Sequence, residues 1–254
     1  MNLKLLSIPA RGLAAVALAL AALVTSAGAQ AALVNVDFNA GTAGPTYSGA
    51  AVVGSAGDVW NGISAGTIGS GTSGNNLALI DAGGANSGIT LSFTQTSGAF
   101  NTGDTCLMSA ASTAALMCDY LYVSSAAPAV TVTFAGLTPG SLFDLILYSM
   151  ANDSGRVTDF TLDSTTQSVT AAAGNNLVQG TNYARFSGTV GAGGELAFAT
   201  AAGQRQDTSF FEGNLNGIQL TLTPAQVPEP ASAALVLVAL AEAVGVRRRQ
   251  RQQV

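Results

Sequence analysis

The chain has 254 residues, with 9 Lys and Arg, 14 Asp and Glu, and no His. The lack of His excludes His-containing catalytic triads and His-ligated zinc. Residues 33–226 hold three Arg and no Lys against twelve acidic side chains, a net charge of −9. So few cations exclude a phosphate-binding surface, and with it nucleic acid as a partner.

The chain begins with the features of a secretory signal peptide, which we place at residues 1–31. Lys4 and Arg11 precede a short apolar run, and small residues follow it. A basic start, a short apolar run and an A-x-A pattern typify export signals. Cleavage after Ala29 and cleavage after Ala31 both satisfy the pattern. The alternative, a retained membrane helix, is disfavoured because the run is short.

Residues 32–226 form the body and read as an all-β domain. Short runs alternate apolar and polar residues with period two, which is typical of strands with one buried face. In the first run Asn35, Asp37 and Asn39 occupy the face opposite the apolar residues. The apolar residues of the predicted strands are Val34, Val36, Phe38, Ile89, Leu91, Phe93, Val130, Val132, Phe134, Phe160, Leu162, Leu196, Phe198, Ile218, Leu220 and Leu222.

The segment Leu142–Tyr148 is apolar on both faces and is predicted to be a central strand. A tight turn at 136–140 precedes it, in which Pro139 sets φ and Gly140 is free to take a positive φ. Ten to twelve short strands at this spacing predict a single β-sandwich, most simply a jelly roll. The Ala-, Gly- and Ser-rich stretches 40–57 and 62–75 are predicted to be long, mobile loops.

Trp60 is the only Trp and lies between Asp58 and Asn61. An aromatic face beside amides and carboxylates is a pattern that binds sugars, so these three residues are the candidate glycan contacts. The alternative is that Trp60 packs in the core, as a single Trp in a β-sandwich commonly does. Tyr47 and the pair Phe210–Phe211 near Glu212 allow the same two interpretations.

The only two cysteines are Cys106 and Cys118, both in the body. An exported body lies in an oxidising compartment, where a disulfide between them would persist. The Ala- and Leu-containing segment between them is predicted to form one helical turn that the disulfide fixes. A catalytic thiol is disfavoured because no His is present to activate it.

Asp153, Asp159 and Asp163 lie within a dozen residues, next to Asn152 and Ser154. Oxygen ligands at this density are a candidate site for a structural Ca²⁺ ion, although no complete calcium loop is present. The alternative is that these carboxylates are solvated turn residues. Apart from this ion, the sequence predicts no cofactor.

Glycoside cleavage on a β-sandwich would use two carboxylates. The body has only two Glu, Glu195 and Glu212, and the three Arg are a small supply of cations for a polysaccharide lyase. The sequence therefore favours a non-enzymatic protein, with no catalytic residues assigned.

The C-terminus, residues 227–254, has three parts in a fixed order. Val227 and a Pro-Glu-Pro motif are followed by an apolar run at 231–246 and then by arginines, which would lie on the cytoplasmic side of a membrane. Glu242 interrupts the run, and sixteen residues is short for a span, so we expect a weak, transient anchor. The alternative is an amphipathic helix packed on the body. The sorting residues are Pro228, Glu229, Pro230, Arg247, Arg248 and Arg249.

This tail resembles the PEP-CTERM sorting signal of exopolysaccharide-producing Gram-negative bacteria. The resemblance implies that an exosortase recognises the Pro-Glu-Pro motif and processes the tail. The body is more diffusely similar to the jelly-roll ectodomains of such proteins and to galactose-binding-like domains. The segments that carry this second similarity are 34–39, 58–61, 136–148 and 214–220.

Together these features predict a β-sandwich between an N-terminal signal-peptide helix and a C-terminal hydrophobic helix. The protein is expected to cross the inner membrane of a Gram-negative bacterium, to be anchored there transiently, and to reach the cell surface or matrix. Its expected partners are the export machinery, an exosortase and exopolysaccharide, bound weakly and without catalysis. The alternatives are a secreted glycan-active enzyme and a purely structural matrix protein.

Overall fold

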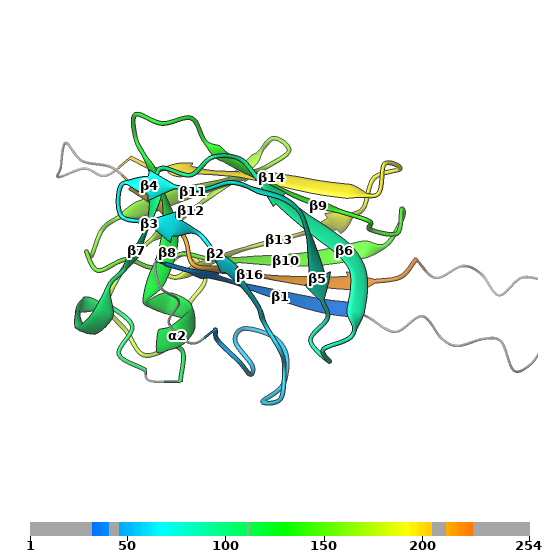
Figure 1. Ribbon diagram of the computed structural model, residues 1–254, viewed down its shortest axis with the longest axis horizontal. Coiled ribbons are helices and arrows are strands. Elements are labelled where there is room, and N and C mark those ends of the chain that lie inside the picture. Colours follow the sequence, from blue (N-terminus) through cyan, green and yellow to red (C-terminus); the bar gives the residue numbers. More distant parts are fainter. Residues whose placement is uncertain (1–31, 41–45, 111, 205–211, 226–254) are drawn as a thin grey trace, which may run out of the picture. The chain divides into compact units, whose positions relative to one another are not determined.

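The structure is a computed structural model that describes residues 32–40, 46–110, 112–204 and 212–225 (Figure 1). These residues form sixteen β-strands, a 3-10 turn η1 (Gly103–Thr105) and one short helix, α2 (Ala114–Met117). The all-β prediction is therefore confirmed. Among the described residues, no helix is long and apolar enough to cross a membrane. The predicted signal peptide and sorting tail lie outside the described ranges.

Two large sheets carry most of the strands. The first is a five-stranded sheet whose strand order is β13, β10, β16, β1, β2. Its strands are β1 (Ala32–Asn39), β2 (Asn61–Ser64), β10 (Leu142–Tyr148), β13 (Tyr183–Thr189) and β16 (Gly217–Thr223). Strand β10 has a hydrogen-bonded neighbour on each side, as predicted for a central strand. Of the pairs described in this sheet, only β1–β2 is parallel.

The second large sheet has six strands in the order β12, β11, β14, β9, β6, β5. Its strands are β5 (Gly74–Ile80), β6 (Asn86–Phe93), β9 (Val130–Ala135), β11 (Val157–Leu162), β12 (Thr165–Thr170) and β14 (Glu195–Ala202). Two smaller sheets complete the body. They consist of β7 (Gly98–Asn101), β8 (Asp119–Ser124) and β15 (Glu212–Leu215), and of β3 (Gly66–Thr67) and β4 (Ser70–Gly71).

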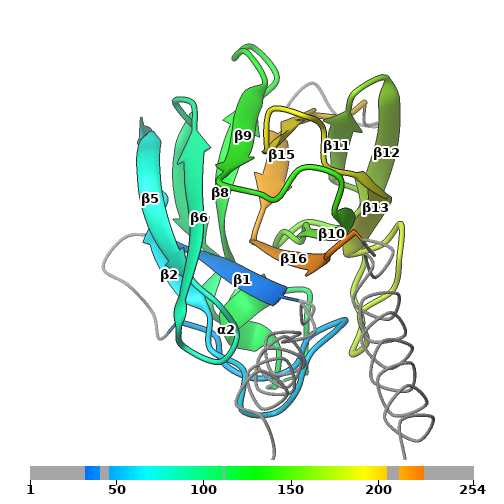
Figure 2. The ribbon, with the colours of Figure 1, turned by 90° about the vertical axis from the view of Figure 1, so that its right-hand side faces the viewer.

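The apolar core lies between the two large sheets, which form separate layers (Figures 1 and 2). The residues predicted to be apolar strand positions supply half of its buried members, and all of them are buried. Strand β9 crosses to β10 in the other layer through the predicted turn, where Gly140 has φ 80° as expected. The β-sandwich prediction is thus confirmed at this level.

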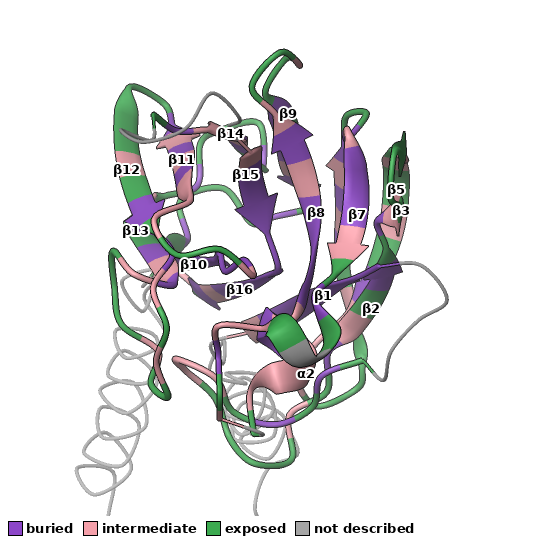
Figure 3. Cartoon of the chain, turned by 90° about the vertical axis from the view of Figure 1, so that its left-hand side faces the viewer, coloured by how far each residue is buried: buried purple, intermediate pink, exposed green. Residues whose placement is uncertain are grey.

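The five-stranded sheet differs from the prediction because much of its second face is also buried, mainly along β1, the start of β16 and the end of β10. We call the face toward the six-stranded sheet the inner face and the opposite one the outer face. In β10, Leu145 and Leu147 join the core between the sheets, whereas Ile146 and Tyr148 belong to a second apolar cluster on the outer face. That cluster is completed by residues of α2 and of the segments 46–60, 106–110 and 171–183. Figure 3 shows the resulting burial of β1 and β16.

The predicted long loops are only partly loops. Described residues 46–60 contain no strand, as predicted, but 62–75 includes β3, β4 and parts of β2 and β5. Residues 46–60 are also held to the sheet: the Val52 N–H donates to the Tyr148 hydroxyl (2.9 Å), and the Val53 N–H donates to Gln219 Oε1 (3.1 Å). The expectation of a loosely held loop is therefore wrong for this segment.

Candidate functional site

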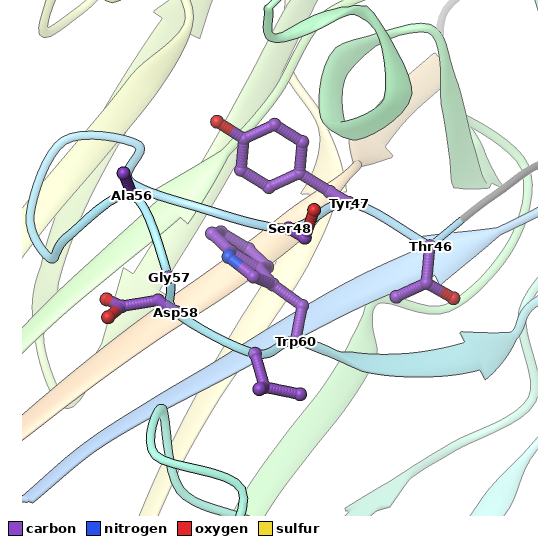
Figure 4. Close-up of a pocket in the computed structure, with 8 residues that line it drawn as sticks. Thr46, Tyr47, Ser48, Ala56, Gly57, Asp58 and Trp60 are labelled. Atoms are coloured by element: carbon purple, nitrogen blue, oxygen red, sulfur yellow. The ribbon is translucent and has the colours of Figure 1, made fainter.

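An open hollow of about 430 Å³ lies where residues 46–48 run beside residues 56–60 (Figure 4). Exposed Thr46 and Ser48 contribute hydroxyl groups, and Asp58 contributes a carboxylate. Exposed Val59 adds an apolar side chain. The hollow thus combines hydrogen-bonding oxygens with a small apolar surface.

Trp60 borders this hollow but is only 4% exposed. Its indole N–H donates to the Gly49 carbonyl (2.9 Å), and its ring meets the Tyr47 ring edge-to-face with 5.0 Å between centroids. The Tyr148 ring packs near it at 6.3 Å. Trp60 therefore packs on the outer face of the sheet, as in the core interpretation, and offers no open ring face to a sugar.

Asp58 and Asn61 have different roles from each other. Asp58 accepts the Ser55 N–H within its own loop (3.0 Å) and lines the hollow. The Asn61 side chain exchanges two hydrogen bonds with the Ile80 backbone and donates a third to the Asn35 carbonyl (2.8 Å). Asn61 thus joins the two sheets at their edge strands. Only Asp58 of the three predicted glycan contacts remains available to a ligand.

A polar network lies on the outer face, at the positions predicted to be the polar side of β1. Gln219 donates to Asn35 Oδ1 (2.9 Å) and to the Val53 carbonyl (3.1 Å), and it accepts the Tyr148 hydroxyl (2.5 Å). Asn35 and Gln219 are fully buried and face each other in the β1–β16 register. The hydrogen bond between them, together with those to neighbouring groups, explains why polar side chains are tolerated here.

A second polar group on this face is not fully satisfied. We call Asp37, Asn39 and Asp119 the buried oxygen cluster. Each is at most 4% exposed, and in each one side-chain oxygen, Oδ1, has no hydrogen-bond partner. The other carboxylate oxygens accept backbone donors: Tyr47 N–H to Asp37 Oδ2 (2.7 Å) and Ala40 N–H to Asp119 Oδ2 (3.2 Å).

Burial dominates the electrostatics of the two carboxyl groups. It raises the pKa of Asp37 to about 8, opposed by the Tyr47 N–H and assisted by the negative charge of Asp119. Burial also raises the pKa of Asp119 to about 6, opposed by the Ala40 N–H. The two described arginines do not neutralise them, because Arg156 pairs with Glu212 and Arg185 pairs with Asp144 (each 2.7 Å).

The disulfide between Cys106 and Cys118 is confirmed, with 5.2 Å between the Cα atoms. Helix α2 is the predicted helical turn between them. Cys118 directly precedes Asp119, so the disulfide and helix fix the start of β8. Asn216 also holds this point by donating to the Met117 (2.9 Å) and Asp119 (2.8 Å) carbonyls.

The predicted calcium residues do not gather into one site. Asp159 points out from β11 and accepts the Ser168 hydroxyl (2.6 Å). Asp163 takes a positive φ of 52° in the two-residue turn between β11 and β12, while Asp153 lies in the turn before β11. In the described ranges, no three His, Cys, Asp or Glu side chains are placed to share a metal ion.

The two Glu of the body are also far apart. Glu195 begins β14, whereas Glu212 lies near Ala201 at the other end of that strand, because its neighbour Gly213 contacts the Ala201 carbonyl. Six residues of strand span roughly 20 Å. Retaining and inverting glycosidases need carboxyl groups about 5–9.5 Å apart. This pair therefore fits neither geometry.

Phe210 and Phe211 lie outside the described residues. The same holds for the sorting residues Pro228, Glu229, Pro230, Arg247, Arg248 and Arg249.

Sequence reasoning missed Asp119 and the role of Asp37 and Asn39. The available signal was the run Asn35, Asp37, Asn39, in which three polar side chains share a face. That pattern alone is equally typical of a solvated face.

No family model and no curated protein matches the chain. Among solved structures, it is similar to the plant receptor-like kinase ANX2 (10% identity, TM-score 0.37), covering 50% of this chain and 38% of that one. It is also similar to the exo-β-1,3-galactanase of Phanerochaete chrysosporium with galactose (15%, 0.26, covering 56% and 32%). A third is the K3 adhesin domain of Lys-gingipain from Porphyromonas gingivalis (11%, 0.23, 41% and 73%). The chain thus spans less than two fifths of the first of these proteins.

Proposed function

We propose that the chain is an exported, non-enzymatic β-sandwich of the jelly-roll class, which works at the cell surface or in the extracellular matrix. The observation that carries this proposal is the Cys106–Cys118 disulfide, because such bonds persist in oxidising compartments. The signal-peptide pattern at the N-terminus and the PEP-CTERM-like tail support export across the inner membrane, with a transient anchor and processing by an exosortase.

The test of sorting changes Pro228 and Pro230 together to Ala in the full chain. We expect the precursor to accumulate uncut in the inner membrane, whereas the wild-type body reaches the surface or medium. The chain is followed by immunoblotting of membrane, surface and culture fractions, with the paired change Ala233→Ser and Ala234→Ser as a control. Uncut wild-type chain in the cytosol would contradict the proposal.

We further propose that the body binds glycan weakly at the hollow beside Asp58. Sugar hydroxyl groups can donate to the Asp58 carboxylate and bond with the Thr46 and Ser48 hydroxyls, while Val59 can contact the apolar side of a ring. Because the Trp60 ring is covered, stacking contributes little, and the affinity is expected to be low.

Retention on the host exopolysaccharide tests this site. Asp58→Ala should lower retention several-fold, whereas Glu195→Ala, which removes an equally charged carboxylate from the other sheet, should not. Equal retention of wild type and Asp58→Ala would remove the hollow from the proposal. Release of reducing sugars or unsaturated uronates during the incubation would instead identify an enzyme.

A further inference from the structure

The buried oxygen cluster is built from three separate parts of the chain. Asp37 and Asn39 lie on the outer face of β1, Asp119 starts β8, and the backbone of Tyr47 reaches in from the loop above. The Ala40 N–H joins the end of β1 to Asp119 across 79 positions of sequence. The strands, the disulfide-anchored helix and the loop therefore fix the cluster.

The cluster presents three buried acceptor oxygens and no donor to satisfy them. Oδ1 of Asp37, of Asn39 and of Asp119 has no hydrogen-bond partner, and the side chains are 0%, 4% and 4% exposed. A buried unpaired carboxylate is costly, and neighbouring carboxylates repel each other. Oxygens that are buried without a partner call for an explanation, and a bound ion is one that fits this group.

Glycines flank Asp37 on both sides in the sheet. In the sheet, Asp37 pairs with Gly217 of β16 on one side and with Gly62 of β2 on the other. A Cβ at Gly62 would collide with Thr46 and Asn39. The two strands that flank Asp37 thus carry no side chain at its level, which lets Thr46 and Asn39 pack close beside it.

The geometry points to a binding site for one Ca²⁺ ion held by Asp37, Asn39 and Asp119. Two carboxylates and an amide oxygen form a hard, all-oxygen donor set, which excludes the N- and S-rich sites of zinc and copper. A divalent ion would match the two negative charges. Mg²⁺ is disfavoured because it keeps several waters, whereas Ca²⁺ accepts six to eight oxygens in flexible geometry, including backbone carbonyls.

The ion would have a structural purpose. It would join the end of β1, the start of β8 and, through Asp37, the loop that begins at Tyr47. This arrangement places the ion beneath the hollow that carries Asp58, although the inference does not depend on glycan binding.

The test measures calcium binding directly on the full chain, purified in detergent and stripped with EDTA. We expect about one calcium per chain by equilibrium dialysis and elemental analysis. The melting temperature should rise by about 3–5 °C at about 1 mM Ca²⁺ and much less with Mg²⁺. Tb³⁺ should give luminescence sensitised by Tyr47 and Trp60, which Ca²⁺ quenches by competition.

Three variants locate the ion. Asp37→Asn and Asp119→Asn keep the side-chain volume and should abolish the calcium-dependent rise in melting temperature. The control Asp159→Asn removes an exposed carboxylate from β11 and should leave the rise unchanged. A rise that persists in both cluster variants, or that disappears in Asp159→Asn, would overturn the assignment.

A gain-of-affinity variant guards against loss of folding. Asn39→Asp adds a third carboxylate and should lower the calcium concentration for half-saturation about three-fold or more, since ligand charge tunes calcium affinity. Unchanged or weaker affinity would contradict the site. Absence of calcium binding by the wild-type chain would also overturn it, and would leave a buried water or a proton shared by the two carboxyl groups.

Discussion

The two faces of the five-stranded sheet are buried by different means. The inner face packs Val34, Val36 and Phe38 against another sheet, so its burial removes only apolar surface from water. The outer face carries Asn35, Asp37 and Asn39 on the same strand and is covered by loops and a short helix. The inner face is therefore stabilised by the apolar surface area that it buries. The stability of the outer face depends also on a hydrogen-bond partner for each buried polar group.

This difference indicates which of the two faces can hold a binding site. An apolar interface gains from every buried atom and has no specific requirement beyond shape. A polar interface penalises each unpaired oxygen, so unpaired oxygens persist where a ligand or another compensation exists. The outer face holds the hollow, the polar network and the buried oxygen cluster, whereas the described residues of the inner face hold none of these.

The largest expected effect is that of Trp60→Ala, which removes the main aromatic residue of the outer face. We expect a loss of about 3–5 kcal/mol in the free energy of unfolding, because the indole is buried and its N–H bond to Gly49 is lost. Urea denaturation measures this loss. Phe38→Ala, on the inner face, is the matched comparison and should cost a similar amount.

A different outcome would reverse the assignment of Trp60. Near wild-type stability of Trp60→Ala together with lost glycan retention would mean that the ring serves a sugar and not the fold.

The second-largest effect is expected from removal of the disulfide, which should destabilise the outer face before the inner face. Cys106→Ser should cost about 3 kcal/mol under oxidising conditions, the chain-entropy value for a loop of this length. Under reducing conditions wild type and variant should be equally stable.

In Cys106→Ser, hydrogen exchange should accelerate first in residues 46–60 and 114–118, while the amides of β10 and β16 stay protected. Equal acceleration in both places would show that the faces open together.

Much of the core between the two large sheets was predictable from sequence. The period-two alternation of β1, β6, β9 and β16 correctly identified residues that meet in the core, and the apolar segment Leu142–Tyr148 was correctly placed as an interior strand. Such patterns are local: each strand shows its buried side by itself. The disulfide was also predictable, because only two cysteines exist.

The outer face was not predictable for a physical reason. Residues 46–60, which cover this face, are rich in Ala, Gly and Ser. Their apolar residues follow neither strand nor helix spacing, so the sequence does not predict a packed segment. The contacts that bury the face are also remote in sequence: Gln219 bonds Asn35 from 184 positions away, and Asp119 bonds Ala40 from 79. A polar side chain in an alternating strand appears solvated until its distant partner is known.

The smallest effect tests whether the polar network stabilises or only specifies the outer face. Gln219→Leu fills the same space but leaves Asn35 Oδ1, the Tyr148 hydroxyl and the Val53 N–H and carbonyl without Gln219. We expect a loss of about 1–3 kcal/mol in the free energy of unfolding, the penalty for buried groups left unpaired.

If this loss comes from the unpaired groups, adding Asn35→Val should restore part of the stability, because replacing both partners by apolar groups can be nearly neutral. A double-mutant cycle in urea measures the coupling. Strictly additive costs would mean that the two side chains act independently.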